Sequence, residues 1–390
     1  MSQYKINNFF IGVCITSLFF HTAYAKNISF GNPDSDLGQV SISGYLRGNI
    51  QDKNFSDNEH KLKFDAAKLI IKYDNPSLFG EMEYRCYQFD KICDFSSLVN
   101  AYVGYKINQT SNIKFGMQDI PFGIGRDWST NWYGDISGTL GVRDVHNLGI
   151  SYHTALPSST QIDAAYFFQD GNDYTGKSKD SARYSANFVQ PDDPSQTYLK
   201  EKNMMIIRVS QDIPTHHTDL KVNIGGSYWY SELENKTFDS TGHRNAWAAF
   251  SQINYKDARL ILTAGQNKVT NKDPIHPDYS VMGSFDSDYY VANKGNFYTV
   301  DLSYTFRNLY GKFNFTPYAT YSSFIKDEDN YDNSTRNILG LQLDYKNYSI
   351  VGEYIIGKND AGLNGTKYSY VQGDDEKTGR MLNILFLYYF

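Results

Sequence analysis

The feature that most constrains this chain is an alternation of apolar and polar residues in segments of roughly ten residues. The stretch 298–306 places Tyr, Val, Leu, Tyr and Phe at every second position, with Thr, Asp, Ser and Thr between them. The stretch 339–346 alternates Leu, Leu, Leu and Tyr with Gly, Gln, Asp and Lys. Because side chains of a strand point alternately to its two faces, the pattern predicts β-strands with one apolar and one polar face.

Counting these segments gives an even number of strands, as expected for a bacterial outer-membrane barrel. The sixteen predicted strands cover 39–50, 60–74, 78–88, 96–107, 112–118, 146–153, 160–169, 203–213, 218–231, 243–256, 258–268, 295–306, 311–323, 335–346, 348–358 and 379–390. A barrel of this size leaves an open lumen, whereas eight strands would fill their interior with side chains. The predicted fold is therefore all-β, a 16-stranded antiparallel transmembrane barrel.

The connections between the predicted strands alternate strictly between short and long. Short turns fall between successive strands near Asn75, Asn108, Pro157, Pro214, Asp257, Asn308 and Asn347. The longer, polar connections are 51–59, 89–95, 119–144, 170–202, 232–242, 269–294, 325–334 and 359–378. Short periplasmic turns and long external loops are typical of outer-membrane barrels. We therefore expect both termini on the periplasmic side.

A soluble β-sandwich also alternates, but it buries its apolar faces and turns polar residues outward. Here the apolar faces carry few charges, and the opposite faces carry Gly, Ser, Asn, Gln and single charges, which suit a wet lumen. Aromatic residues make up 16% of the chain, with 33 Tyr and 25 Phe. Tyr and Trp prefer the two interfaces of a bilayer. The composition thus favours the membrane barrel.

The first residues have the features of an export signal. Lys5 precedes the apolar stretch 9–20, and Ala23 and Ala25 supply small residues for cleavage. A retained anchor is disfavoured, because the apolar stretch is short for a membrane span. We expect a cleaved signal peptide at 1–25, a short periplasmic segment at 26–38 and the barrel at 39–390, in the outer membrane of a Gram-negative cell.

Two cysteines follow the predicted signal peptide, Cys86 and Cys93. An exported protein meets an oxidising compartment, so a local disulfide is the default expectation. A metal site is a weak alternative, because no His or further Cys lies nearby in the sequence.

The long connection 119–144 differs in composition from the others. It contains Trp128 and Trp132 together with several apolar residues, which are poor choices for a solvated loop tip. We expect this third external loop to fold inward against the barrel wall and to narrow the lumen. The residues expected at this constriction are Asp119, Arg126, Asp127, Asp135, Arg143 and Asp144.

The segment 116–123, Gly-Met-Gln-Asp-Ile-Pro-Phe-Gly, resembles the G-x-x-x-x-P-F-G segment of the phosphate-selective porin O and P family. The early Ala-Ala-Lys-Leu stretch at 66–69, the signal peptide and the terminal Phe fit the same family. About ten residues match specifically, whereas the architecture matches over the whole chain after residue 25. The resemblance implies a homotrimeric sixteen-stranded barrel for uptake of small, often anionic solutes. The dense basic ladder on which the family's phosphate selectivity depends is not obvious here.

Charged residues on the predicted inner faces indicate a weak anion preference or none. The basic ones outnumber the acidic ones there, although Asp and Glu (43) exceed Lys and Arg (37) in the whole chain. Rings of Lys or Arg in a narrow lumen favour anions. The inner basic residues are Arg47, Lys68, Lys72, Arg85, Lys106, Lys114, Arg208, Lys221, Arg259, Lys312, Arg336 and Lys346; the acidic ones are Glu81, Glu83, Asp163, Asp212, Asp301, Asp344 and Glu353.

The most consistent function is passive diffusion of small hydrophilic solutes. No G-x-S-x-G motif accompanies the eight His residues, so we expect no enzyme, and we expect no cofactor or metal. The acidic charge of −6 disfavours nucleic-acid binding. A plugged transporter needs a plug domain, for which 26–38 is too short. The remaining alternative is an outer-membrane adhesin or receptor that binds a partner through long loops such as 170–202 and 269–294.

Overall fold

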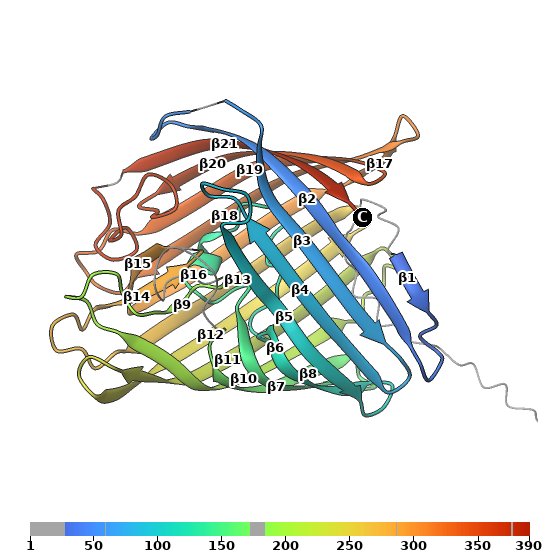
Figure 1. Ribbon diagram of the computed structural model, residues 1–390, viewed down its shortest axis with the longest axis horizontal. Coiled ribbons are helices and arrows are strands. Elements are labelled where there is room, and N and C mark those ends of the chain that lie inside the picture. Colours follow the sequence, from blue (N-terminus) through green and yellow to red (C-terminus); the bar gives the residue numbers. More distant parts are fainter. Residues whose placement is uncertain (1–27, 59, 172–183, 286, 376) are drawn as a thin grey trace, which may run out of the picture.

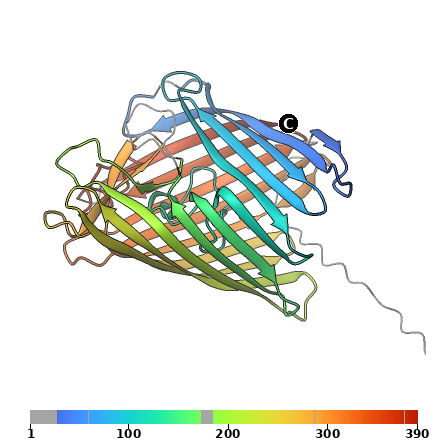
Figure 2. The same cartoon turned by 60° about the horizontal axis from the view of Figure 1, so that its bottom comes forward.

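The strands of the computed structural model wrap into a closed barrel, shown in Figures 1 and 2. The structure describes residues 28–58, 60–171, 184–285, 287–375 and 377–390. The predicted signal peptide, 1–25, lies outside the described residues. None of the described residues belongs to a helix long and apolar enough to cross a membrane.

Sixteen antiparallel strands form the ring within the described residues. They are β2 (Gln39–Lys53), β3 (Lys63–Asp74), β4 (Leu78–Tyr87), β5 (Phe95–Lys106), β6 (Ser111–Asp119), β7 (His146–Ala155), β8 (Thr160–Gln169), β10 (Leu199–Ile213), β11 (Leu220–Asn235), β12 (Ser240–Tyr255), β13 (Ala258–Thr270), β16 (Lys294–Tyr304), β18 (Phe313–Lys326), β19 (Ser334–Tyr345), β20 (Tyr348–Lys358) and β21 (Thr378–Tyr389). The ring closes where β2 pairs with β21, with Tyr45 opposite Tyr389. The predicted fold class and strand number are confirmed.

Strand boundaries agree with the sequence predictions to within a few residues. The largest extensions lie at the ends joined by long connections, where β10 begins at Leu199 and β11 continues to Asn235. We call the end of the barrel with these long connections the loop end and the other the turn end. β1 (Ile28–Gly31) pairs with β2 at the turn end, and β17 (Phe306–Leu309) continues β16 there.

Part of the loop end is ordered into a second, small sheet. β9 (Asn187–Phe188), β14 (Tyr279–Ser284) and β15 (Ser287–Ala292) pair antiparallel. The sequence pattern assigns these residues to the connections 170–202 and 269–294. Val189, Val281, Tyr290 and Val371 are buried together here, so these two connections pack on one another and on the connection 359–378. The short helix α1 (Ile136–Thr139) lies in the third loop.

The outer face of the barrel is apolar and the inner face is largely polar. On β16, Tyr298, Val300 and Leu302 are exposed on the outside, whereas Thr299 and Asp301 are buried on the inside. Exposed aromatic side chains gather close to the turn end: Tyr105, Tyr255, Tyr304, Phe306 and Tyr348. An apolar band bordered by aromatic residues is the arrangement that a lipid bilayer requires of a barrel.

Candidate functional site

The eight predicted wall residues share the inner face of the barrel. Within the ring, Lys68 pairs with both Tyr45 and Arg85, and Lys72 pairs with Glu81. They come from β2, β3, β4, β6 and β10 and are Arg47, Lys68, Lys72, Glu81, Glu83, Arg85, Lys114 and Arg208. Two other residues predicted to face inward, Lys312 and Lys346, instead lie in turns, where strand alternation no longer fixes direction.

Glu83 on β4 is the centre of a charged cluster on this wall. Its side chain is 1% exposed, and Arg85 Nη2 lies 2.5 Å from its Oε1. Arg126 of the third loop reaches Glu83 Oε2 with Nη1 at 2.7 Å, and Lys68 Nζ lies 3.3 Å from Oε1. Three cations thus surround one carboxylate, so the third loop is tied to the β3–β4 wall by charge.

A second carboxylate, Asp144, continues the cluster at the end of the third loop. Arg126 Nε donates to Asp144 Oδ1 at 2.8 Å, and His146 Nε2 lies 2.9 Å from the same oxygen. Burial would raise the pKa of the Asp144 carboxyl, but the charge of Arg126 and the contact with His146 hold that pKa well below its usual range. Asp144 therefore stays ionised and fixes the guanidinium of Arg126.

Tyr184 closes this cluster from a different loop. Arg85 Nη1 donates to the Tyr184 hydroxyl at 2.7 Å, and that hydroxyl donates to Asp144 Oδ2 at 2.7 Å. The Arg85 guanidinium also lies over the Tyr184 ring, 4.8 Å from its centre. Sequence reasoning missed Tyr184, because it stands in the connection 170–202, where no alternation indicates which way a side chain points.

The third loop, residues 120–145, also contacts the wall formed by β16, β18 and β20. Thr130 Oγ1 donates to Asp301 Oδ1 at 2.6 Å. The backbone N–H groups of Trp132 and Tyr133 donate to the two oxygens of Glu353, at 2.6 and 3.1 Å. Asp301 and Glu353 were predicted as wall acids; their role in holding the loop was missed.

An aromatic cluster seats the first half of the third loop on the wall. Trp128 is fully buried beside Phe122 and Phe297, and Phe122 packs on Trp229 of β11. Gly123 has φ +58°, and a Cβ there would lie 2.3 Å from the Trp128 ring. Only glycine fits this turn without strain. The Trp residues that mark this connection in the sequence thus pack inside the barrel.

The six predicted constriction residues fall into distinct environments. Arg126 and Asp144 form the ion pair described above, and Arg143 Nη1 lies 3.2 Å from the buried Asp135 Oδ2. Asp119, the last residue of β6, is 4.0 Å from Lys114 Nζ. Asp127 is the exposed member of the six.

The inner wall beside the charged cluster is partly apolar, and Lys68 of the cluster lies next to Tyr45. Tyr45, Tyr318, Leu385 and Leu387 are buried together on the inner faces of β2, β18 and β21. Trp132 of the third loop meets the Tyr45 ring edge-on, with ring centres 6.1 Å apart. Near the third loop, charged and aromatic side chains therefore lie next to one another on the inner wall.

The predicted disulfide is present between Cys86, at the end of β4, and Cys93. It closes the connection in which Phe89 packs on Phe95. Among the described residues, no three His, Cys, Asp or Glu side chains are grouped so that they could hold a metal ion.

Three solved structures with the same fold support a comparison over nearly the whole chain. The outer membrane channel DcaP of Acinetobacter baumannii has a TM-score of 0.59 at 14% identity, covering 92% of this chain and 99% of that chain. Salmonella typhi OmpF, solved in complex with daunomycin, has a TM-score of 0.57 at 12% identity, covering 93% and 100%. An anion-selective porin from Comamonas acidovorans has a TM-score of 0.54 at 14% identity, covering 90% and 99%.

At these identities the likeness concerns the fold, which is that of Gram-negative outer-membrane porins. No protein-family model matches the chain, and no curated protein sequence matches it.

Proposed function

We propose that the protein is an outer-membrane porin, a passive diffusion channel for small hydrophilic solutes rather than an enzyme. The observation that carries the proposal is a closed ring of sixteen strands, counted over the described residues, with an apolar outer face and a polar inner face. A ring of this size is wide enough for an aqueous lumen. The similarity in fold to several porins supports the same function.

The proposed location is the outer membrane of a Gram-negative cell, with both termini and the short turns on the periplasmic side. Residues 1–25 would be removed as a signal peptide, leaving a short segment at 26–38 and the barrel at 39–390. The similarity of segment 116–123 to the phosphate-selective porin O and P family supports a homotrimer as the assembly. Outer-membrane lipid is then the direct partner of the apolar outer face.

We further propose that the third loop narrows the lumen and that the charged cluster gives a weak anion preference. The cluster contains three cations, Arg85, Arg126 and Lys68. It contains two carboxylates, Glu83 and Asp144, so cations are in excess. Asp127, exposed on the loop, offsets part of this excess. A small positive excess in a narrow lumen attracts anions weakly.

A liposome-swelling assay tests the proposed function directly. Liposomes that contain the folded protein are expected to swell in small sugars, amino acids and small anions, at rates that fall with solute size. Protein-free liposomes and liposomes with the heat-unfolded protein are the controls. A failure to swell in any solute, with the barrel folded, would favour the adhesin or receptor function of the long loops.

A further inference from the structure

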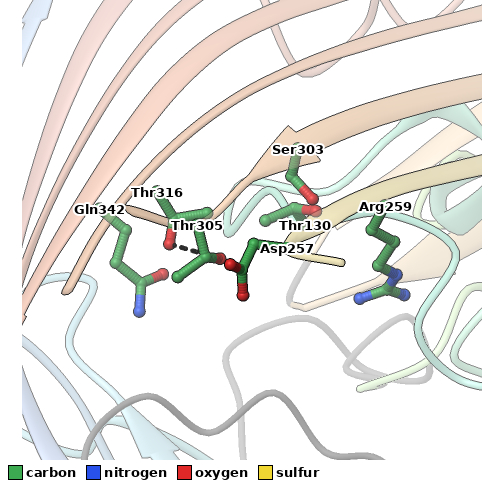
Figure 3. Close-up of a pocket in the computed structure, with 7 residues that line it drawn as sticks. All are labelled: Thr130, Asp257, Arg259, Ser303, Thr305, Thr316 and Gln342. Atoms are coloured by element: carbon green, nitrogen blue, oxygen red, sulfur yellow. Dashed lines mark hydrogen bonds between the residues drawn. The ribbon is translucent and has the colours of Figure 1, made fainter. Parts of the chain in front are cut away.

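A pocket in the inner wall near the turn end is not used by the third loop's constriction. Figure 3 shows the residues that line it, at the start of β13 and on the neighbouring strands. Arg259 and Asp257 line it from the β12–β13 turn and the first residues of β13, and Ser303, Thr305 and Thr316 line it from the adjoining wall. Thr130 of the third loop borders it.

Arg259 differs from the other inward-facing arginines. Its guanidinium has no hydrogen-bond or ion-pair partner among the described residues, and its Nε is buried and unsatisfied. Asp301 and Asp127 act on it electrostatically without forming an ion pair with it. The other inward arginines each lie within 4.0 Å of a carboxylate: Arg47, Arg85, Arg208, Arg244 and Arg336. An unpaired guanidinium in a pocket is a ready partner for an anionic group.

The other polar side chains that line the pocket are suited to form hydrogen bonds with the hydroxyl groups of a ligand. Thr305 and Thr316 share one hydrogen bond, 3.1 Å between their Oγ1 atoms, which leaves one hydroxyl hydrogen free to donate. One oxygen of Asp257 accepts from Arg307 Nε at 2.5 Å, which leaves the other oxygen as an acceptor. In Figure 3 the Asp257 carboxylate lies between the Arg259 guanidinium and the Gln342 amide. A ligand in this pocket would therefore contact the Arg259 guanidinium at one side. Next to that cation it would find both hydrogen-bond donors and hydrogen-bond acceptors.

We propose that this pocket binds small hydroxycarboxylates, such as sugar acids, as they pass through the lumen. Arg259 binds the carboxylate, and Asp257, Ser303 and the Thr305–Thr316 pair bind the hydroxyl groups. The inference rests on the proposed function, because the pocket lines the same lumen. It adds a solute class and a binding position separate from the Glu83 cluster.

Calorimetric titration of the full chain, folded in detergent, tests the pocket with potassium gluconate as the probe. Acetate supplies a carboxylate without hydroxyl groups, and sorbitol supplies hydroxyl groups without a charge. Gluconate is expected to bind more tightly than either. Arg259→Gln is expected to weaken gluconate binding about 10-fold, the cost of one charge-assisted hydrogen-bonding group. Ser303→Ala is a milder second variant and should weaken gluconate binding without affecting acetate binding.

Lys221→Gln is the matched control for charge. Lys221 faces the same inner wall at the same level, since it pairs with Asn254, which pairs with Arg259. The control should retain gluconate binding. Equal losses in the two charge variants, or equal binding of gluconate by wild type and Arg259→Gln, would overturn the proposed site. Ion currents through bilayers separate the two proposals, because a conducting protein that binds no gluconate contradicts the pocket and leaves the channel intact.

Discussion

At the scale of single residues, carboxylates on the inner wall have two different surroundings. Glu83 is compensated by cations, with Arg85, Arg126 and Lys68 around it. Glu353 instead accepts from neutral groups, the N–H groups of Trp132 and Tyr133 among them. The first arrangement gathers cations beside the third loop, and the second holds the loop that we propose narrows the lumen.

Glu83→Gln should make the channel more anion-selective and less stable. The change removes the negative charge shared by three cations, so the lumen becomes more positive. Loss of one partner from a buried ionic cluster costs roughly 3 kcal/mol. Reversal potentials in a KCl gradient and urea unfolding measure the two effects.

Glu81→Gln is the matched control for that change. Glu81 lies two residues away on the same face, but its ionic partner is Lys72 alone among the described residues, 3.3 Å away. Glu81→Gln should change the reversal potential and the free energy of unfolding less than Glu83→Gln does. An unchanged or cation-directed reversal potential in Glu83→Gln would contradict the role of the cluster.

The Asp144 carboxylate predicts a pH dependence of stability. Its pKa lies well below the usual value of about 3.9, so the stability it contributes is full above roughly pH 4 and is lost as pH falls through the lower, folded-state pKa. The difference in unfolding free energy between wild type and Asp144→Asn should be constant from neutral pH to about pH 4 and should shrink below it. A difference that disappears already near pH 5 would show that Asp144 is not held ionised.

At the scale of elements, the third loop is held by both sides of the barrel. Arg126 ties it to β4, and Asp301 and Glu353 tie it to β16 and β20. Buried Trp128 fixes the segment between these attachments. A loop attached at several points keeps a defined shape, whereas an untethered loop would fluctuate; the proposed constriction would therefore have a fixed shape.

Glu353→Gln should loosen the third loop. A carboxylate accepts both the Trp132 and Tyr133 N–H groups, but the amide nitrogen of Gln cannot accept one. Single-channel records should show larger current noise and a changed mean conductance. Asp212→Asn is the control, because Asp212 is also a predicted inner-wall acid and its carboxylate accepts from Asn223 Nδ2 on β11, near the turn end. Identical records for wild type and Glu353→Gln would argue against this tether.

Replacing both cysteines by serine should lower stability moderately. The disulfide joins residues seven apart, and closing so short a loop is worth about 2–3 kcal/mol in the chain-entropy model. Thermal unfolding should show a lower midpoint for the Cys86→Ser/Cys93→Ser double variant. A reducing agent should lower the midpoint of the wild type to the same value and leave the variant unchanged. A midpoint insensitive to both changes would mean that this connection does not limit stability.

The strands were predictable from the sequence because each one is defined by its own alternation. The loop end was not, because its contacts join residues that are far apart in the chain. Tyr184 binds Arg85 and Asp144 from another loop, and β14 is buried on both faces, which removes the alternation of polar and apolar residues. The charged residues of the third loop can be read from the sequence, but their partners depend on how the loops pack.

At the scale of the whole molecule, polar and apolar groups are arranged in reverse of a water-soluble protein. Leu302 and Leu339 are exposed on the outer face, 54% and 62%, whereas Asp301 and Glu353 are buried inside. This arrangement explains how a chain with 21% charged residues and many aromatics can suit a membrane. It also separates the net acidity of the chain from the excess of cations in the cluster around Glu83.

The most direct test of the central claim is the current through a planar lipid bilayer containing the full folded chain. A porin should give stepwise increases in current that scale with KCl concentration, and a reversal potential slightly toward anions in a salt gradient. A barrel that inserts into the bilayer in its folded form and conducts no ions would contradict the channel function.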